Sequence, residues 1–344
     1  MDIIYGEKHI RHAGRVELYD GDLVPCFEKP ERAQLVLDQV RARSLGDVLS
    51  PEAHGLEPLR RVHSQSYLDF LRTAWSDWRV VHGDTDALPI NWPVRSLSQR
   101  VPDSIDGRMG FYSMDAATPI TEGTWEAATE AADSALTALD RIQSGRGGAF
   151  ALVRPPGHHA AGDFCGGYCY LNNAAIAAQS FIDQIGDRVA ILDVDYHHGN
   201  GTQSIFYDRS DVFFQSIHGD PNQEFPYFLG FADECGSGEG RGLNRNFPLA
   251  WGTTAELWFE AVDEALRGIT EYKPGLVVVS LGVDTYKGDP ISHFLLESTD
   301  YSRLGERIAR LGLPVLFVLE GGYAVEEIGV NVVNTLGAYD AAAG

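Results

Sequence analysis

Five short and predominantly apolar runs constrain the fold of this chain more than any other feature. They cover residues 149–153, 189–192, 212–217, 276–281 and 315–319. Strands that read as nearly continuous apolar runs are covered on both faces, as in parallel sheets. Stretches with apolar residues at helical spacing lie among these runs, at 124–142, 173–185, 254–272 and 299–311. This alternation predicts an α/β fold, a parallel multi-stranded sheet with helices on both faces.

One segment does not follow the alternation. Between residues 77 and 123 no period holds, prolines interrupt the chain and aromatic residues recur. An irregular segment of this length is usually functional or disordered, and the aromatic content argues against disorder. We therefore expect a single domain over residues 1–344 with a long irregular insertion near residues 77–123. Thr124 is expected to cap the helix that follows.

The charge balance narrows the choice of partners. The chain has 49 Asp and Glu against 27 Lys and Arg, which gives a net charge of −22. No segment concentrates enough Lys and Arg to bind a phosphate backbone, so we expect no nucleic-acid partner. A negative field instead attracts cationic ligands.

The cysteines and the apolar runs indicate a location. Four cysteines are too few and too scattered for a disulfide framework, so we expect a reducing cytoplasm. Cys165 and Cys169 have no second pair at zinc-finger spacing and are expected to be buried small residues. The apolar runs are far shorter than the roughly 20 residues of a membrane-spanning helix, and the N-terminus lacks an export-signal pattern. We expect no membrane partner.

Polar residues that can carry chemistry stand at the ends of the apolar runs. They are the pair His158 and His159, the segment 193–198, His218, Asp284 and Tyr323. In open parallel sheets, ligands bind just outside the carboxyl ends of the strands. We therefore expect these residues to converge on one crevice, although up to 165 positions separate them.

Asp195, His197 and Asp284 have the chemistry of metal ligands. Two carboxylates and one imidazole would leave a coordination position open, as in catalytic sites. Asp195 and His197 point to the same side of an extended strand because the side-chain period is two. Asp193 shares that side, where it could ligate a second ion or orient a histidine.

A metal with an open position suits the hydrolysis of an unactivated amide. Such a reaction needs a base for the water proton and an acid for the leaving amine, and His158 and His159 are the candidates. The Tyr323 phenol, after two glycines, can stabilise the developing oxyanion. Gly167 and other glycines of these loops allow close approach of the backbone to a ligand.

Four motifs carry a resemblance to a known family. Residues 155–159, 193–201, 280–284 and 320–323 together resemble the histone deacetylase superfamily, which has the arginase-deacetylase fold. Within it, the sequences around residues 17–19, 23–25 and 27–28 and the long insertion look like those of bacterial acetylpolyamine amidohydrolases.

The resemblance implies roles for the site residues. A single catalytic Zn²⁺ would bind to Asp195, His197 and Asp284, with Fe²⁺ left open as an alternative ion. His158 would be held by Asp193, and His159 would act as general base and then as general acid. The position of Asn200 carries an Asp in eukaryotic deacetylases, so the amide makes it uncertain which histidine is the working acid.

The resemblance also implies groups around this centre. Tyr168 and Phe225 would form the aromatic walls of a substrate tunnel. Structural potassium would lie near Asp193, Asp195, His197, Ser216 and Ile217, and a second monovalent ion near Phe206 and Val212. The insertion would build a homodimer and narrow the tunnel mouth.

We thus expect a zinc amidohydrolase that deacetylates a cationic aliphatic amine such as an acetylpolyamine. Acidic residues near the mouth, Asp103, Asp106 or Asp115, would bind the distal ammonium groups. Three alternatives stay open: a deacetylase of acetyl-lysine in proteins or peptides, a dinuclear manganese ureohydrolase, and a protein that binds acetylated amines without turnover.

Overall fold

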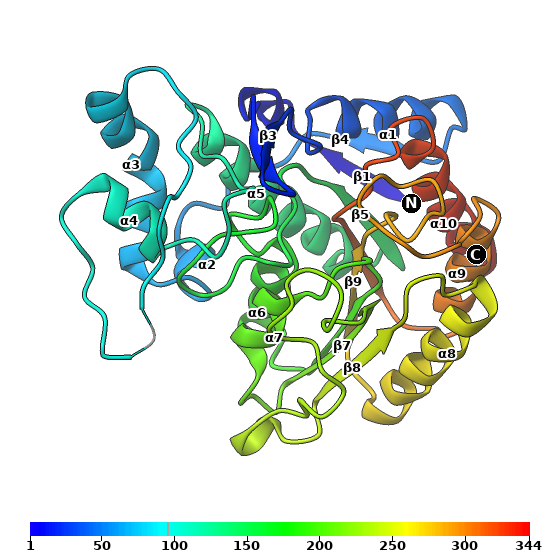
Figure 1. Cartoon of the computed structure of the whole chain (residues 1–344). Coiled ribbons are helices and arrows are strands. Elements are labelled where there is room, and N and C mark those ends of the chain that lie inside the picture. The colour runs from blue at the N-terminus through cyan, green and yellow to red at the C-terminus, as the bar shows by residue number, and fades with distance from the viewer. Residues whose placement is uncertain (95) are drawn as a thin grey trace.

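Eight parallel strands form the central sheet of the protein (Figure 1). The structure is a computed structural model that describes residues 1–94 and 96–344. Every neighbouring pair of strands in this sheet is parallel, which confirms the predicted fold class. Across the sheet the order is β4 (Asp47–Leu49), β1 (Asp2–Tyr5), β5 (Gly148–Leu152), β10 (Val315–Leu319), β9 (Leu276–Leu281), β6 (Val189–Asp193), β7 (Val212–Gly219) and β8 (Asn244–Leu249).

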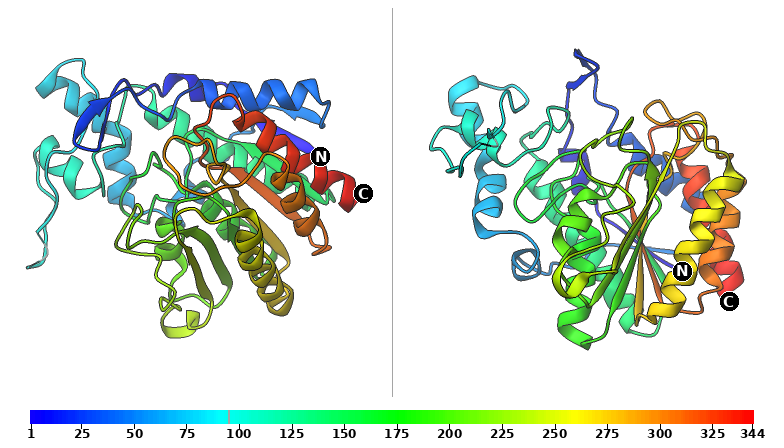
Figure 2. Two further views of the ribbon diagram at one scale, coloured as in Figure 1. Left: turned by 45° about the vertical axis from the view of Figure 1, so that its right-hand side comes forward. Right: turned by 60° about the horizontal axis from the view of Figure 1, so that its bottom comes forward.

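Helices cover both faces of this sheet and make it a single α/β domain. The right-hand view of Figure 2 shows α8, α9 and α10 along one face and α6 along the other. The first face is covered by α1 (Glu31–Ala42), α8 (Ala255–Tyr272), α9 (Asp300–Ala309) and α10 (Ile328–Ala343). The second is covered by α5 (Thr124–Gln143), α6 (Asn173–Ile185) and α7 (Asn200–Phe206), with the single turn α2 (Glu57–Arg60) beside α6.

The insertion is more regular and better packed than the sequence predicts. Residues 77–82 belong to α3 (Gln65–His82), and α4 (Ile105–Phe111) lies within the insertion. Trp78 is buried and continues the apolar face of α3, whose spacing therefore extends past the predicted boundary. Tyr112 stacks on Phe70 with ring centroids 4.7 Å apart. Part of the insertion is thus anchored in a second hydrophobic core.

Other elements differ from the prediction in detail or were missed. Thr124 is the first residue of α5 and not its cap, and its hydroxyl accepts a hydrogen bond from the backbone N–H of Thr121 at 2.7 Å. The unpredicted hairpin of β2 (Glu17–Tyr19) and β3 (Asp22–Val24) stands apart from the main sheet. No helix in the described residues combines the length and the apolar character that crossing a membrane requires.

The register of the strands brings the candidate residues to one edge. Asp193 at the end of β6 lies beside Ser280 on β9 and Ser216 on β7. Leu319 at the end of β10 lies beside Leu281 at the end of β9. The loops that follow these strands therefore start at nearly the same level of the sheet.

Candidate active site

Three buried side chains form a compact group of possible metal ligands. Asp195 and His197 come from the loop after β6, and Asp284 comes from the loop after β9. Their ligand atoms all lie within 4.8 Å of one another. Nδ1 of His197 is 3.1 Å from Asp284 Oδ2 and 3.4 Å from Asp195 Oδ1. The predicted convergence of these three residues is present in the structure.

The electrostatics of this group fit a cation. Asp195 and Asp284 are fully buried carboxylates at short range. Burial and the charge of Asp195 raise the pKa of Asp284 to about 8, because two buried like charges disfavour each other. A divalent ion would relieve this repulsion, and one imidazole with two carboxylates is a donor set that zinc accepts.

The two histidines of the predicted pair lie side by side but have different partners. Their ring centroids are 4.0 Å apart. Nδ1 of His158 is 3.0 Å from Asp193 Oδ2, whereas Nδ1 of His159 is 2.6 Å from the amide oxygen of Asn200. The expected contacts of both histidines are therefore found.

These different partners shift the pKa values of the two rings in opposite directions. Burial disfavours the charged form of His158, but the Asp195 and Asp193 carboxylates outweigh it and raise its pKa to about 10. Burial and the neighbouring His158 and His197 lower the pKa of His159 well below its usual value. His159 is thus the neutral imidazole that can accept a proton.

Tyr323 presents its phenol to the same space. Gly322 before it has φ 134°, which only glycine adopts readily. The Tyr323 ring meets the Tyr168 ring at a centroid distance of 5.5 Å, and the Arg32 guanidinium lies 4.6 Å from its centroid. Burial raises the pKa of Tyr323 well above its usual value, so the phenol stays a hydrogen-bond donor.

A cavity of about 360 Å³ joins these groups to the surface. His159, His197 and Tyr323 line its inner part, and Tyr168, Phe225 and Gly167 line its walls, as expected. The Phe225 ring lies 5.1 Å from the His159 ring. The remaining lining residues are Leu18, Tyr19, Asp20, Trp92, Asp115, Ala116, Ala117, Glu224, Tyr227 and Ile291.

The acidic residues expected at the mouth are placed differently. Asp106 lies outside the described lining, and its carboxylate is 2.7 Å from Nε2 of His82. Asp103 is exposed and also lies outside that lining. Asp115 lines the cavity, but its oxygens accept hydrogen bonds from the backbone N–H of Gly167 at 2.5 Å and of Ala117 at 2.9 Å. Neither Asp103 nor Asp106 is thus among the residues that line this cavity.

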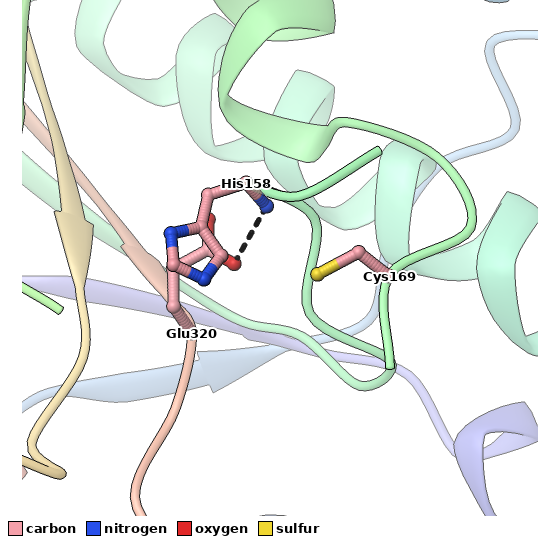
Figure 3. A group of neighbouring side chains, drawn as sticks. All are labelled: His158, Cys169 and Glu320. Carbon is pink, nitrogen blue, oxygen red and sulfur yellow. Dashed lines mark hydrogen bonds between the residues drawn. The ribbon is translucent and has the colours of Figure 1, made fainter. Parts of the chain in front are cut away.

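A second group of potential ligands supports the histidine loop. Figure 3 shows His158, Cys169 and Glu320 together. One Glu320 oxygen already accepts the backbone N–H groups of Gly157 at 2.7 Å and His158 at 3.1 Å. Cys169 is buried as predicted, and burial raises the pKa of its thiol well above its usual value. A protonated thiol is a poor metal ligand.

Sequence reasoning missed the residues that hold these loops. Glu320 follows the last apolar run directly and belongs to the motif 320–323, but neither signal gave it a role. Glu17 of β2 is buried, and its carboxylate accepts a hydrogen bond from the Tyr168 hydroxyl at 2.9 Å. Asp289, after β9, accepts the backbone N–H of Tyr323 at 2.6 Å. Asp289 stands outside the four motifs, and Glu17 belongs to the segment 17–19 that resembles the amidohydrolases but was given no role there.

The residues expected around potassium lie on two adjacent strands and their flanks. Ser216 and Ile217 belong to β7, and Ser216 is in register with Asp193. Phe206 ends α7 and Val212 begins β7. All four are buried.

Taken together, a buried N,O ligand set, a neutral histidine and a phenol on one cavity provide the parts of a metal-dependent amide hydrolase. A model of the histone deacetylase domain matches residues 26–338. The chain belongs to the histone deacetylase family, which is metal-dependent, and it is a hydrolase that acts on amide bonds.

Individual relatives agree with this assignment. The chain is 58% identical over 340 residues to acetylpolyamine amidohydrolase 2 of Pseudomonas aeruginosa, with 99% of each chain covered. It is 49% identical over 336 residues to acetylpolyamine amidohydrolase of Mycoplana ramosa, with 98% of each covered. The crystal structure of acetylpolyamine aminohydrolase from Burkholderia pseudomallei matches with a TM-score of 0.95 at 38% identity, over 100% of both chains. The resemblance found in the sequence is confirmed.

Proposed function

We propose that this protein removes the acetyl group from N-acetylated polyamines or similarly slender cationic amines, with one Zn²⁺ per chain held by Asp195, His197 and Asp284. The observation that carries the proposal is the gathering of this ligand set with neutral His159 and protonated Tyr323 at one cavity. The similarity to acetylpolyamine amidohydrolases supports the choice of substrate.

The histidine pair moves the proton. When bound, the metal lowers the pKa of a water molecule and polarises the acetyl carbonyl. Nδ1 of His159 donates to Asn200, so Nε2 is free to take the water proton and to return it to the leaving amine. His158, held in its charged form by Asp193 and Asp195, stabilises the neutral resting state of His159.

Tyr323 stabilises the oxyanion. Its phenol donates a hydrogen bond to the carbonyl oxygen as negative charge develops there. Preorganised donors of this kind contribute about 3–4 kcal/mol in the transition state.

The cavity selects the amine. Tyr168 and Phe225 offer apolar walls to a methylene chain. Asp20 and Glu224 line the cavity, and we assign to them the recognition of a distal ammonium group in place of Asp106. Asp20 is exposed, and Glu224 is fixed in place by the Tyr196 hydroxyl and the Trp251 indole, which donate to its Oε2 at 2.8 Å and 3.2 Å. The rings of Tyr19 and Tyr227 line the same space, where a cation can lie against their faces. Burial raises the pKa of both phenols, and the charges of Asp20 and Glu224 raise it further.

Three further parts of the proposal concern the whole protein. We propose a homodimer through the insertion, because Ile90, Trp92 and Val94 there are 74%, 42% and 68% exposed. We place structural K⁺ near Asp193 and Ser216 and a second monovalent ion near Phe206 and Val212. The four free cysteines support a reducing cytoplasm.

A substrate panel with zinc-loaded protein tests the proposal. The panel contains N-acetylputrescine, the uncharged analogue N-butylacetamide and an acetyl-lysine peptide, and acetate release is measured. We expect the highest kcat/KM for acetylputrescine, because only this substrate is both slender and cationic at its free end. Absence of acetate release from every substrate would contradict the proposed function, and preference for the peptide would shift it to peptide deacetylation.

A further inference from the structure

The loop that carries Tyr323 has little stiffness of its own. Two glycines precede the tyrosine, and Gly322 has φ 134°. Glycine leaves the backbone many alternative conformations, so an outside contact must select the one that aims the phenol at the cavity. A backbone hydrogen bond from Val283 N–H to Gly321 C=O at 3.0 Å ties the loop down before the turn. Arg32 donates to the carbonyl oxygens of Glu320 at 2.6 Å and Gly322 at 2.7 Å, and the Gly321 N–H donates to Asp195 at 2.7 Å. These contacts hold the chain up to Gly322, and none of them takes the backbone N–H of Tyr323 or of the residue after it.

Asp289 holds the loop after the turn, at Tyr323 and the residue that follows it. This residue lies in the loop between β9 and α9, five positions after Asp284, and it is only 7% exposed. Its Oδ2 accepts the backbone N–H of Tyr323 at 2.6 Å and that of Ala324 at 3.1 Å. Its Oδ1 accepts the backbone N–H of Ile291 at 3.1 Å.

Two of these three contacts end on residues of the candidate active site. Tyr323 and Ile291 both line the cavity, and they come from the loops after two different strands. One buried carboxylate therefore joins the two loops and fixes a lining residue on each. Hydrogen bonds from backbone N–H groups to a carboxylate are charge-assisted and stronger than those between neutral groups.

We propose that Asp289 is a positioning residue that clamps the Tyr323 loop to the loop of Asp284 and thereby sets the phenol over the metal site. The inference rests on the proposed role of Tyr323 in deacetylation. It assigns to Asp289 no contact with substrate.

Asp289→Ala tests the clamp by a double-mutant cycle with Tyr323→Phe. We expect Asp289→Ala to lower kcat about tenfold or more, because a misplaced catalytic group is far less effective. In the Tyr323→Phe background the same substitution should change kcat less than twofold. An equal loss in both backgrounds, or no loss in the wild-type background, would overturn the inference.

A measurement without substrate separates the inference from the proposed function. Hydrogen exchange of the peptide covering 320–326 should become faster in Asp289→Ala by tenfold or more. Asp300→Ala is the matched control, because Asp300 is a buried carboxylate on the same connection that accepts the N–H of Glu297 at 2.9 Å. Exchange that rises equally in the control, or not at all in Asp289→Ala, would contradict the clamp even if the enzyme acts on another substrate.

Asp289→Asn refines the assignment. An amide has one accepting oxygen, so it can serve the Tyr323 side or the Ile291 side but not both. We expect Asp289→Asn to retain most of the kcat lost in Asp289→Ala, with a KM that rises because Ile291 is released. A kcat as low as that of Asp289→Ala together with an unchanged KM would contradict this account of the two oxygens.

Discussion

Nδ1 of His159 lies 2.6 Å from the side-chain oxygen of Asn200, and this contact fixes which nitrogen of the ring faces the cavity. The amide oxygen can only accept, so the ring proton stays at Nδ1 and Nε2 carries the free lone pair. An amide is also neutral and adds no charge that would favour the imidazolium. The contact therefore orients His159 without raising its basicity to the degree that a carboxylate would.

Asn200→Asp should change the pH dependence of the reaction. A carboxylate at this position favours the charged imidazole and raises the pKa of His159. We expect the acid limb of the kcat/KM profile to move to higher pH by about one unit or more. Tyr323→Phe is the control, since it should lower the rate without moving that limb. An acid limb that stays in place or moves to lower pH would show that His159 is not the base.

Loss of the catalytic groups should reduce turnover without unfolding the protein. We expect Tyr323→Phe to lower kcat by about 10²–10³, the usual effect of removing one oxyanion donor. Tyr339→Phe removes another phenol, which donates to the Gly147 carbonyl at 2.9 Å away from the cavity, and should leave kcat unchanged. Steady-state assays with measured zinc content decide between the outcomes. A Tyr323→Phe variant with wild-type kcat would remove the phenol from the mechanism.

The mouth acids should act on binding of the charged end of the substrate. We expect the double variant Asp20→Asn and Glu224→Gln to raise KM for acetylputrescine by about tenfold, because exposed Asp20 and half-buried Glu224 no longer attract the ammonium group. The kcat should change little, and kinetics with uncharged N-butylacetamide should be unaffected. Asp106→Asn is the control with wild-type KM. An equal rise in KM for both substrates would mean that shape, not charge, is recognised.

Glu17→Gln should stabilise the protein at neutral and higher pH. Burial raises the pKa of Glu17 to about 7, above the ordinary value of 4.5. Between these values the folded state keeps a proton that the unfolded state has lost, so stability falls as pH rises through this window. The glutamine has no charge to bury, and we expect the variant to gain about 2 kcal/mol over the wild type between pH 5 and pH 8. Urea unfolding at pH 5 and at pH 8 measures the free energy of unfolding of the variant and of the wild type. If the variant exceeds the wild type by the same amount at both pH values, the raised pKa of Glu17 is contradicted.

The sequence predicted the residues that form the site better than it predicted the residues that hold them in position. Asp195, His197 and Asp284 were found because strand ends of a parallel sheet meet at one edge, which is a rule of topology. The apolar runs allowed that topology to be inferred from the sequence. Topology does not say from which donor a distant carboxylate accepts a hydrogen bond. The contacts of Asp289 with the Tyr323 N–H and of Glu17 with the Tyr168 hydroxyl were therefore found only in the structure.

The substrate-binding residues show the same limit. Tyr168 and Phe225, expected through family resemblance, line the cavity, whereas Asp106 was expected at the mouth and lies beside His82. The position of a side chain in an irregular segment depends on long-range packing, and the sequence pattern there has no period to reveal it. Asp20 escaped notice because it lies on a short hairpin outside the main sheet.

The metal environment tests the central claim most directly. Zinc-edge X-ray absorption of the loaded protein reports the number and type of ligand atoms, with Zn–S near 2.3 Å and Zn–N or Zn–O at about 2.0–2.2 Å. We predict one zinc per chain with nitrogen and oxygen ligands only, as Asp195, His197 and Asp284 provide. A sulfur scatterer would place the ion at His158, Cys169 and Glu320 instead, and that result would contradict the account.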